Sequence, residues 1–231
     1  MNLYFIILVF ILFLVVSIFA YNEFKDRELL KTVTKLNRGT RSEHKMVLKI
    51  LKSGIKSTAI FHDLYLNNGN GKYSQIDLVV ATKVGIVVFE VKEYSGWIFG
   101  NENKINWTQI LAYGKRKYKF YNPILQNKKH VEDLKKFYHF DNIPVFSIIV
   151  FFGDCEFKNL IDLPSRTFLT KSNKVIKIFN AILENNQPAK YENKWEIANL
   201  LKQAVKNGEN SIIREKHIEN IEKLKSRNRI Y

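Results

Sequence analysis

Two acids and a lysine in the middle of the chain have the types and spacing of a hydrolytic site. Asp77 and Glu90 lie in two runs of alternating apolar residues joined by a short turn at Lys83 and Val84, which predicts a β-hairpin. A two-residue loop at this turn places Asp77 directly opposite Glu90, with Cβ atoms about 4.5–5.5 Å apart. Side chains alternate along a strand, so Lys92 shares the face of Glu90.

Two opposed carboxylates repel each other unless a positive charge lies between them. Carboxylate oxygens, together with water and a substrate phosphate, are the ligands that Mg²⁺ accepts. A metal ion polarises a phosphoryl oxygen and lowers the pKa of its bound water, and a neighbouring lysine orients that water or stabilises the developing negative charge. The residues thus predict a metal-assisted phosphodiesterase site. The alternative is a surface charge cluster, which the many Val and Ile residues of both runs argue against.

The elements that must position these residues predict an α/β body with a helical tail. Around the hairpin we expect a helix after Gly39-Thr40, a strand at 58–66, a loop at 67–72 and a buried strand at 145–152. We expect further helices at Trp107–Tyr118, from Asn122-Pro123 to about residue 140, and at 173–183, 194–205 and 209–226.

Several short motifs of the chain resemble the NERD (nuclease-related) domain. They are Glu43, Gln75-Ile76-Asp77, Val84-Gly85-Ile86, Phe89-Glu90-Val91-Lys92, Gly96-Trp97, Trp107 and Asn122-Pro123 with Gln126. The resemblance covers residues 39–152 and implies a branch of the PD-(D/E)XK nuclease superfamily, akin to Mrr-type restriction nucleases and archaeal Holliday-junction resolvases. It implies a restriction-endonuclease-like mixed β-sheet flanked by helices.

The same resemblance implies a role for each residue of the site. Asp77 and Glu90 would hold Mg²⁺, with Mn²⁺ as a substitute, and Lys92 would assist the attacking water. Glu43 would position the metal or a water, and Gln126 would line the site from the next helix. Glu43 also completes a capping box, Thr-Arg-Ser-Glu, so a role at the start of its helix stays open beside the catalytic one.

Other residues with reactive or aromatic side chains are predicted to be structural. None of the histidines has a spacing typical of a metal site, the tryptophans are expected to pack in the core, and the single cysteine has no evident base partner. The residues interpreted in this way are His62, His130, His139, Trp97, Trp107 and Cys155.

The charge of the chain points to a polyanionic partner. Lys and Arg number 37 against 22 acids, a formal charge of +15. Residues 113–136 are especially basic and are interleaved with aromatic residues, a composition that suits nucleic acid, with DNA favoured over RNA. A solvated helix face, or attraction to anionic lipid, is the alternative. The residues predicted to bind nucleic acid are Lys115, Arg116, Lys117, Lys119, Lys128 and Lys129.

Residues 3–21 predict a single membrane-spanning helix. They are apolar or aromatic except for Ser17, and as a helix they would extend roughly 28 Å, close to the hydrocarbon thickness of a bilayer. A cleaved signal peptide is the alternative, weakened by the missing basic n-region and the long apolar run. Basic residues follow the segment and none precedes it, so the positive-inside rule places the N-terminus outside the cell membrane and the body in the cytoplasm.

This organisation leads to three functional hypotheses. The first is a membrane-anchored, Mg²⁺-dependent nuclease, with residues 22–38 as a charged stalk between anchor and nuclease-like domain. The second is a catalytically inactive, membrane-tethered protein that binds nucleic acid. The third is a scaffold protein that uses a mostly helical C-terminal extension at 153–231.

Overall fold

The computed structural model describes residues 3–69, 71–111, 114–138, 142–158 and 163–227 as a mixed α/β protein, which confirms the predicted fold class. The helices are α1 (Leu3–Lys31), α2 (Arg41–Lys52), the short η1 (Ser57–Ala59), α3 (Pro123–Tyr138), α4 (Val175–Asn185), α5 (Lys194–Asn207) and α6 (Ser211–Arg227). The strands are β1 (Ile60–Asn67), β2 (Tyr73–Thr82), β3 (Gly85–Glu93), β4 (Gly96–Phe99), β5 (Asn106–Leu111), β6 (Arg116–Tyr121), β7 (Val145–Phe152), β8 (Cys155–Lys158) and β9 (Thr167–Lys171).

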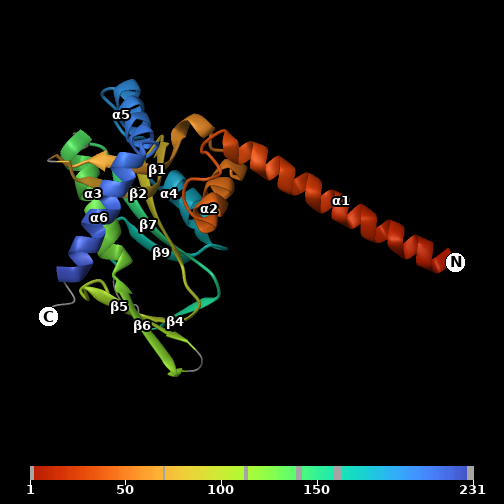
Figure 1. Ribbon diagram of the computed structural model, residues 1–231. Coiled ribbons are helices and arrows are strands. Elements are labelled where there is room, and N and C mark those ends of the chain that lie inside the picture. Colours follow the sequence, from red (N-terminus) through yellow and green to blue (C-terminus); the bar gives the residue numbers. More distant parts are fainter. Residues whose placement is uncertain (1–2, 70, 112–113, 139–141, 159–162, 228–231) are drawn as a thin grey trace.

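The main sheet has five strands in the order β1-β2-β3-β7-β9. Strands β1, β2 and β3 are antiparallel, whereas β3, β7 and β9 are parallel. Apolar side chains of α2 and α4 cover one face of this sheet, and those of α3 and α5 cover the other. Both faces of β7 are therefore buried, as its unbroken apolar sequence predicts. Figure 1 shows these layers around the central strands.

The predicted hairpin is confirmed, and its ladder of paired residues ends just before Asp77 and Glu90. Thr82 pairs with Gly85 across the turn, and the ladder continues to the pair Leu78 and Phe89. Beyond that pair, β2 is paired only with β1 and β3 only with β7. The two strands thus separate at the position of Asp77 and Glu90, and the gap between them holds the candidate site.

A second sheet lies beyond the end of β3, in the order β6-β5-β4-β8. The helix expected from Trp107 toward Tyr118 is wrong, because β5 and β6 form an antiparallel hairpin there. The burial pattern of β5 has period two, with Trp107 and Gln109 buried and their neighbours exposed or half-buried, which fits a strand and not a helix. Tyr94 stacks on Phe120 with ring centroids 4.3 Å apart, and this contact joins the two sheets.

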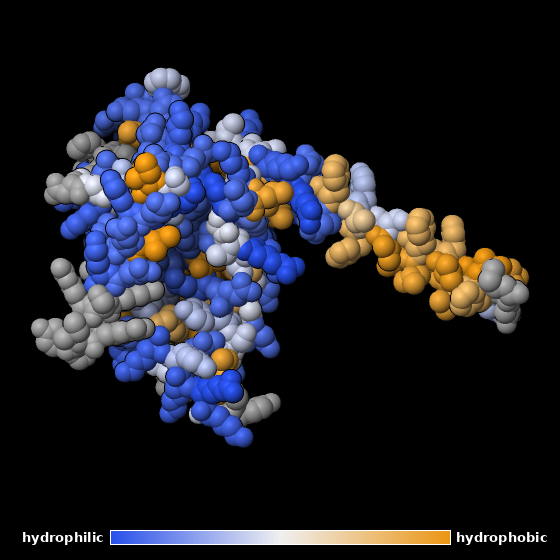
Figure 2. All heavy atoms as spheres, viewed as in Figure 1, coloured by the Kyte–Doolittle hydropathy of each residue, from blue (hydrophilic) through white to orange (hydrophobic). Residues whose placement is uncertain are grey.

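Helix α1 extends away from the body and is long and apolar enough to cross a membrane (Figure 1). Within its most apolar window none of the residues is buried, so it is not a core helix of the described protein. The same length and composition also fit a signal sequence. Figure 2 shows the apolar part of α1 as a continuous hydrophobic surface beside a largely hydrophilic body. At its other end Leu30 is buried, and Asp26 pairs with Lys52 of α2.

Candidate active site

The candidate site lies in the gap where β2 and β3 separate. Asp77 comes from β2, while Glu90 and Lys92 come from β3. Helix α2 contributes Glu43 and helix α3 contributes Gln126. All five predicted residues thus belong to elements that border this gap, although they are far apart in the sequence.

The side chain of Asp77 replaces a missing backbone partner. Its Oδ2 accepts a hydrogen bond of 2.7 Å from the Val91 backbone N–H, just beyond the end of the β2–β3 ladder. Burial raises the pKa of Asp77 well above its ordinary value, and the negative charges of Glu90 and Glu43 raise it further. This carboxyl group therefore lies among like charges, where a cation or a proton would stabilise it.

Glu90 is the buried centre of the site, and its side chain is 1% exposed. Its Oε1 lies 2.7 Å from Nζ of Lys92, and its Oε2 lies 3.4 Å from Nε2 of His130. Burial alone would raise the pKa of Glu90, but the contact with His130 and the charge of Lys92 outweigh burial and lower it. Glu90 is thus held as a carboxylate.

Lys92 is held as a cation between two oxygens. In addition to Glu90, its Nζ donates a hydrogen bond of 3.0 Å to Oε1 of Gln126. Burial alone would lower the pKa of Lys92, but the charges of Glu90 and Asp77 outweigh it and raise the pKa. A lysine in this state supplies positive charge and is not a general base.

Helix α3 is anchored so that Gln126 and His130 face the site. Asn122 precedes the helix, and its Oδ1 accepts a hydrogen bond from the Ile124 backbone N–H, which confirms the predicted N-cap. The buried Asn127 side chain donates to the Val88 carbonyl oxygen of β3 at 3.1 Å and to Ser147 Oγ of β7 at 2.8 Å. These two bonds fix the helix against the central strands.

Glu43 combines the two roles that the sequence left open. Thr40 Oγ1 accepts from the Glu43 backbone N–H, which confirms the cap at the start of α2. The Glu43 carboxylate accepts from Thr40 Oγ1 at 2.8 Å and lies 3.2 Å from Nε2 of the buried His62. Burial alone would raise the pKa of Glu43, but the hydrogen bonds with His62 and Thr40 outweigh it and lower the pKa. The negative charge of Glu43 also raises the pKa of Asp77.

The donor set fits a hard divalent cation. Both carboxylate oxygens of Glu90 are buried without a hydrogen bond of good geometry, and the carboxyl of Asp77 lies close enough to repel them. Among the described residues no three His, Cys, Asp or Glu side chains form a complete metal cage. Mg²⁺ does not require one, because it keeps several waters and binds proteins through one or two carboxylates.

The predicted nucleic-acid-binding residues lie before or on β6 and on the following helix, α3. Lys115 lies in the turn before β6, and Arg116, Lys117 and Lys119 lie on β6 itself. The remaining two are on α3, where Lys129 forms an ion pair with Asp133 and Lys128 is exposed.

Comparison with known proteins identifies the family of the central part of the chain. Residues 38–152 match the family described as "Nuclease-related domain", NERD, a range that includes all five site residues. Residues 38–152 are a NERD domain. A curated relative, an uncharacterized protein of Bacillus anthracis, is 31% identical over 121 residues, which cover 52% of this chain. The chain spans 56% of the length of that relative. No solved structure matches the chain with significance.

Two histidines of the NERD domain were interpreted from the sequence as structural, and the structure places both beside site carboxylates. His130 contacts Glu90 and His62 contacts Glu43. His130 lies one helical turn after Gln126 on α3, so an i, i+4 pairing with a candidate site residue was the signal that could have found it. His139 lies outside the described residues.

The two tryptophans of the NERD domain differ in burial. Trp107 is fully buried and donates from Nε1 to the Asn101 carbonyl oxygen, in agreement with the predicted packing role. Trp97 is 37% exposed, so unlike Trp107 it is not a residue of the buried core. Cys155 is buried, and burial raises the pKa of its thiol, which agrees with the inert character expected of it.

Proposed function

We propose that the protein is a membrane-anchored, Mg²⁺-dependent nuclease that hydrolyses phosphodiester bonds of nucleic acid, DNA in preference to RNA, at the cytoplasmic face. One observation carries the proposal: Asp77, Glu90 and Lys92 meet at the point where β2 and β3 separate. Membership of the nuclease-related family and the +15 charge support the choice of substrate.

The residues divide the chemistry between them. Asp77 and Glu90 would hold the metal ion, which when bound polarises the phosphoryl oxygen and lowers the pKa of its water. Lys92 stays protonated and would stabilise negative charge that develops on the phosphate. Gln126 holds the Lys92 ammonium group in place, and His130, whose Nε2 lies 3.4 Å from the second oxygen of Glu90, would orient that oxygen. Glu43 would orient a water from the α2 side.

The anchoring part of the proposal rests on α1 and its flanks. The apolar part of α1 would span the bilayer, and Lys25, Arg27 and Lys31 at its far end would keep the body on the cytoplasmic side. Attached in this way, the nuclease domain would act on nucleic acid close to the membrane.

Metal-dependent cleavage by the full-length protein in detergent tests the proposal. We expect product from DNA with Mg²⁺ or Mn²⁺ and none with EDTA, and loss of product, by about 100-fold or more, in Asp77→Asn. Asp26→Asn is the matched control, because Asp26 pairs with Lys52 on the surface away from the gap. Equal cleavage by Asp77→Asn and Asp26→Asn would contradict the mechanism.

Lys92→Ala is a second test that requires a folding control. Removal of the ammonium group strips a buried carboxylate of its ion pair and costs about 3 kcal/mol of stability. Activity of this variant is therefore compared below its own unfolding temperature. Salt-sensitive binding of DNA without product at any metal concentration would instead identify a tethered, inactive nucleic-acid-binding protein.

A further inference from the structure

The outer face of the small sheet carries an exposed aromatic residue that the candidate site does not use. Ile98 of β4 and Trp107 of β5 are buried in the core cluster beneath the sheet. Side chains alternate along a strand, so Trp97 points to the opposite, outer face. Trp97 is 37% exposed, so part of its large aromatic surface is open to solvent.

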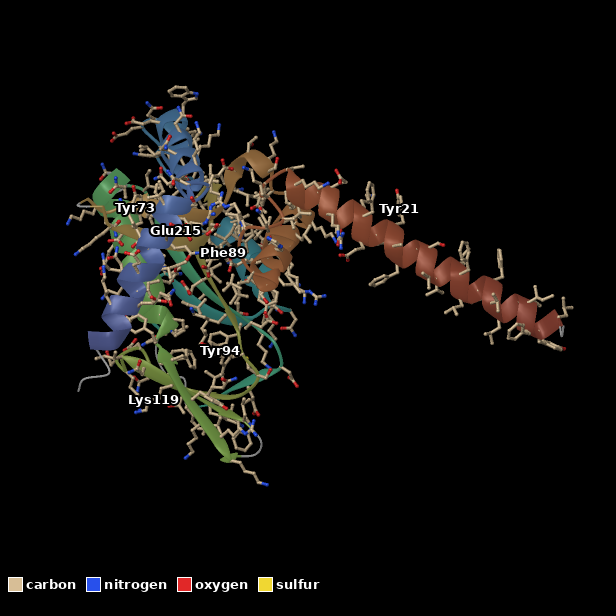
Figure 3. All side chains as sticks on the ribbon, viewed as in Figure 1. Tyr21, Tyr73, Phe89, Tyr94, Lys119 and Glu215 are labelled. Carbon is tan, nitrogen blue, oxygen red and sulfur yellow. The ribbon has the colours of Figure 1, made fainter. Side chains whose placement is uncertain are left out.

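The strand register places lysines on the same face as Trp97. Trp97 pairs with Ile110 and Glu156, and Ile110 pairs in turn with Lys117. In the next row Phe99 pairs with Thr108 and Lys158, and Thr108 pairs with Lys119. We call this surface the Trp97 face; it consists of Trp97, Phe99, Thr108, Ile110, Lys117, Lys119, Glu156 and Lys158. Figure 3 shows Lys119 projecting from this sheet, with Tyr94 between it and the main sheet.

A cavity of about 700 Å³ opens beside the tryptophan. Trp97 and Ile110 supply its apolar wall, and Asp154, Glu156 and Lys171 supply polar groups. Its size is within the range of small-molecule pockets, so a planar aromatic ring can enter and lie against Trp97. Lys158 approaches the same ring, with Nζ 5.7 Å from its centroid, and also pairs with Glu156.

Aromatic and cationic groups in this arrangement suit single-stranded nucleic acid. Every base has a π-face that can stack on an aromatic side chain, while lysines beside it contact the backbone phosphates. Bases within a duplex are already stacked on each other and cannot reach Trp97. The lysines Lys117 and Lys119 are exposed on β6 and available to phosphates.

The Trp97 face is also close to the candidate site. Trp97 lies five positions after Lys92 in the chain, so their Cα atoms are at most about 18 Å apart. A single strand of a few nucleotides is long enough to span that distance.

We propose that the Trp97 face binds a single-stranded segment of nucleic acid, with one unpaired base stacked on Trp97 in the cavity and the adjoining phosphates on Lys117, Lys119 and Lys158. This inference rests on the proposed function, because it takes nucleic acid as the substrate and specifies its single-stranded form. It assigns β6 to substrate binding and gives Trp97 a role distinct from that of Trp107.

Anisotropy of a fluorescein-labelled single-stranded DNA oligomer, with the full-length protein in detergent and EDTA present, tests this proposal without cleavage. Trp97→Ala is expected to weaken binding about 5- to 100-fold, as for the loss of one base-stacking contact, and Trp97→Phe to restore part of it. Trp195→Ala is the matched control, because Trp195 is 76% exposed on α5, outside the Trp97 face. Binding of the same sequence as a duplex should not change in Trp97→Ala.

Salt dependence separates the phosphate contacts from the stacking. Lys117→Ala with Lys119→Ala should reduce the slope of log affinity against log salt by about 1.4, because each single-strand phosphate contact contributes about 0.7. Trp97→Ala should leave the slope unchanged. Thermal unfolding of each variant confirms that the comparison is between folded proteins.

Two outcomes would overturn the proposal. One is equal oligomer binding by Trp97→Ala, Trp195→Ala and the unchanged protein. The other is that the variant with both Lys117→Ala and Lys119→Ala loses binding to phosphatidylglycerol vesicles but keeps its binding to the oligomer. That result would make the Trp97 face a membrane contact. The binding assay contains EDTA and so does not depend on cleavage. Loss of oligomer binding in Trp97→Ala therefore supports the Trp97 face even if the protein yields no product with any metal ion. Absence of product would overturn only the proposed hydrolytic function.

Discussion

The carboxyl group of Asp77 lies among the negative charges of Glu90 and Glu43, which the charge of Lys92 and a hydrogen bond from the Val91 N–H offset only in part. Its raised pKa means that the folded protein binds this proton more tightly than the unfolded chain does. The stability from the protonated form is therefore present below the unfolded pKa and is lost as pH rises through the folded pKa. At neutral pH the charged carboxylate of Asp77 therefore reduces the stability of the folded protein.

Asp77→Asn should raise the unfolding free energy at neutral pH in EDTA by about 1 kcal/mol, while it removes cleavage. The amide oxygen can still accept from Val91, so the main change is loss of charge. Thermal unfolding as a function of pH checks this: the advantage of the variant should shrink as pH falls through the folded pKa of Asp77. Mg²⁺ should raise the unfolding temperature of the unchanged protein and not of the variant. A variant less stable than the unchanged protein at every pH would contradict the assignment.

At the scale of elements, the strands beside the split between β2 and β3 contain two residues with positive φ, Gly85 at the start of β3 and Asp63 within β1. Gly85 has a φ of +140°, and a Cβ there would lie 2.1 Å from the Pro144 carbonyl oxygen. The Pro144 oxygen accepts from the Ile86 N–H at 2.9 Å, which begins the pairing of β3 with β7. On the other side, Asp63 has a φ of +53° and interrupts the β1–β2 ladder opposite Asp77.

Gly85→Ala should therefore destabilise the protein by more than about 2 kcal/mol, because the added Cβ meets backbone atoms of the next strand. Gly54→Ala is the matched control: Gly54 also has positive φ, +94°, but nothing lies within 4 Å of its added Cβ. This second change should cost only about 1 kcal/mol, the conformational penalty alone. Equal midpoints of urea unfolding for the two variants would contradict the proposed close contact.

At the scale of the whole molecule, α1 is joined to the body by direct packing contacts with α2. Its polar end packs on α2 through Leu30 and the Asp26–Lys52 ion pair, and α2 also carries Glu43. The buried Arg38 follows α1 and binds the Asp63 carboxylate, with Nε and Oδ2 2.9 Å apart, and the Val205 carbonyl oxygen of α5. Helix α1 and the NERD domain are therefore connected through packed elements rather than a free linker.

Protease added to spheroplasts that express the full chain tests the proposed topology. The body should be protected until the membrane is permeabilised, because the basic residues that follow the apolar part of α1 would keep it on the cytoplasmic side. The protein should remain in the membrane fraction after a high-salt wash and retain its N-terminal residues by sequencing. Digestion in intact spheroplasts, or an N-terminus that begins after the apolar segment, would show that α1 acts as an export signal.

Much of the local structure could be predicted from the sequence, because it depends on short-range patterns. Alternation and a two-residue turn predicted the β2–β3 hairpin, and Thr40 and Asn122 predicted the starts of α2 and α3. The helix predicted after Trp107 was wrong because the charged and aromatic residues there fit the repeat of a helix as well as that of a strand. The pairing of β5 with β4 and β6 is what makes this segment a strand.

Residue types and spacing by themselves determined which groups are available for chemistry: an apolar helix at the N-terminus, a basic body, and two acids with a lysine on adjoining strands. Tertiary structure alone decided which of them meet. His130 lies beside Glu90 because Asn127 fixes α3 against the sheet. Trp97 is exposed because Ile98 of β4 and Trp107 of β5 face the core, which leaves Trp97 on the opposite face. Such contacts join residues distant in sequence, and their free energy depends on burial and on partners that no local pattern records.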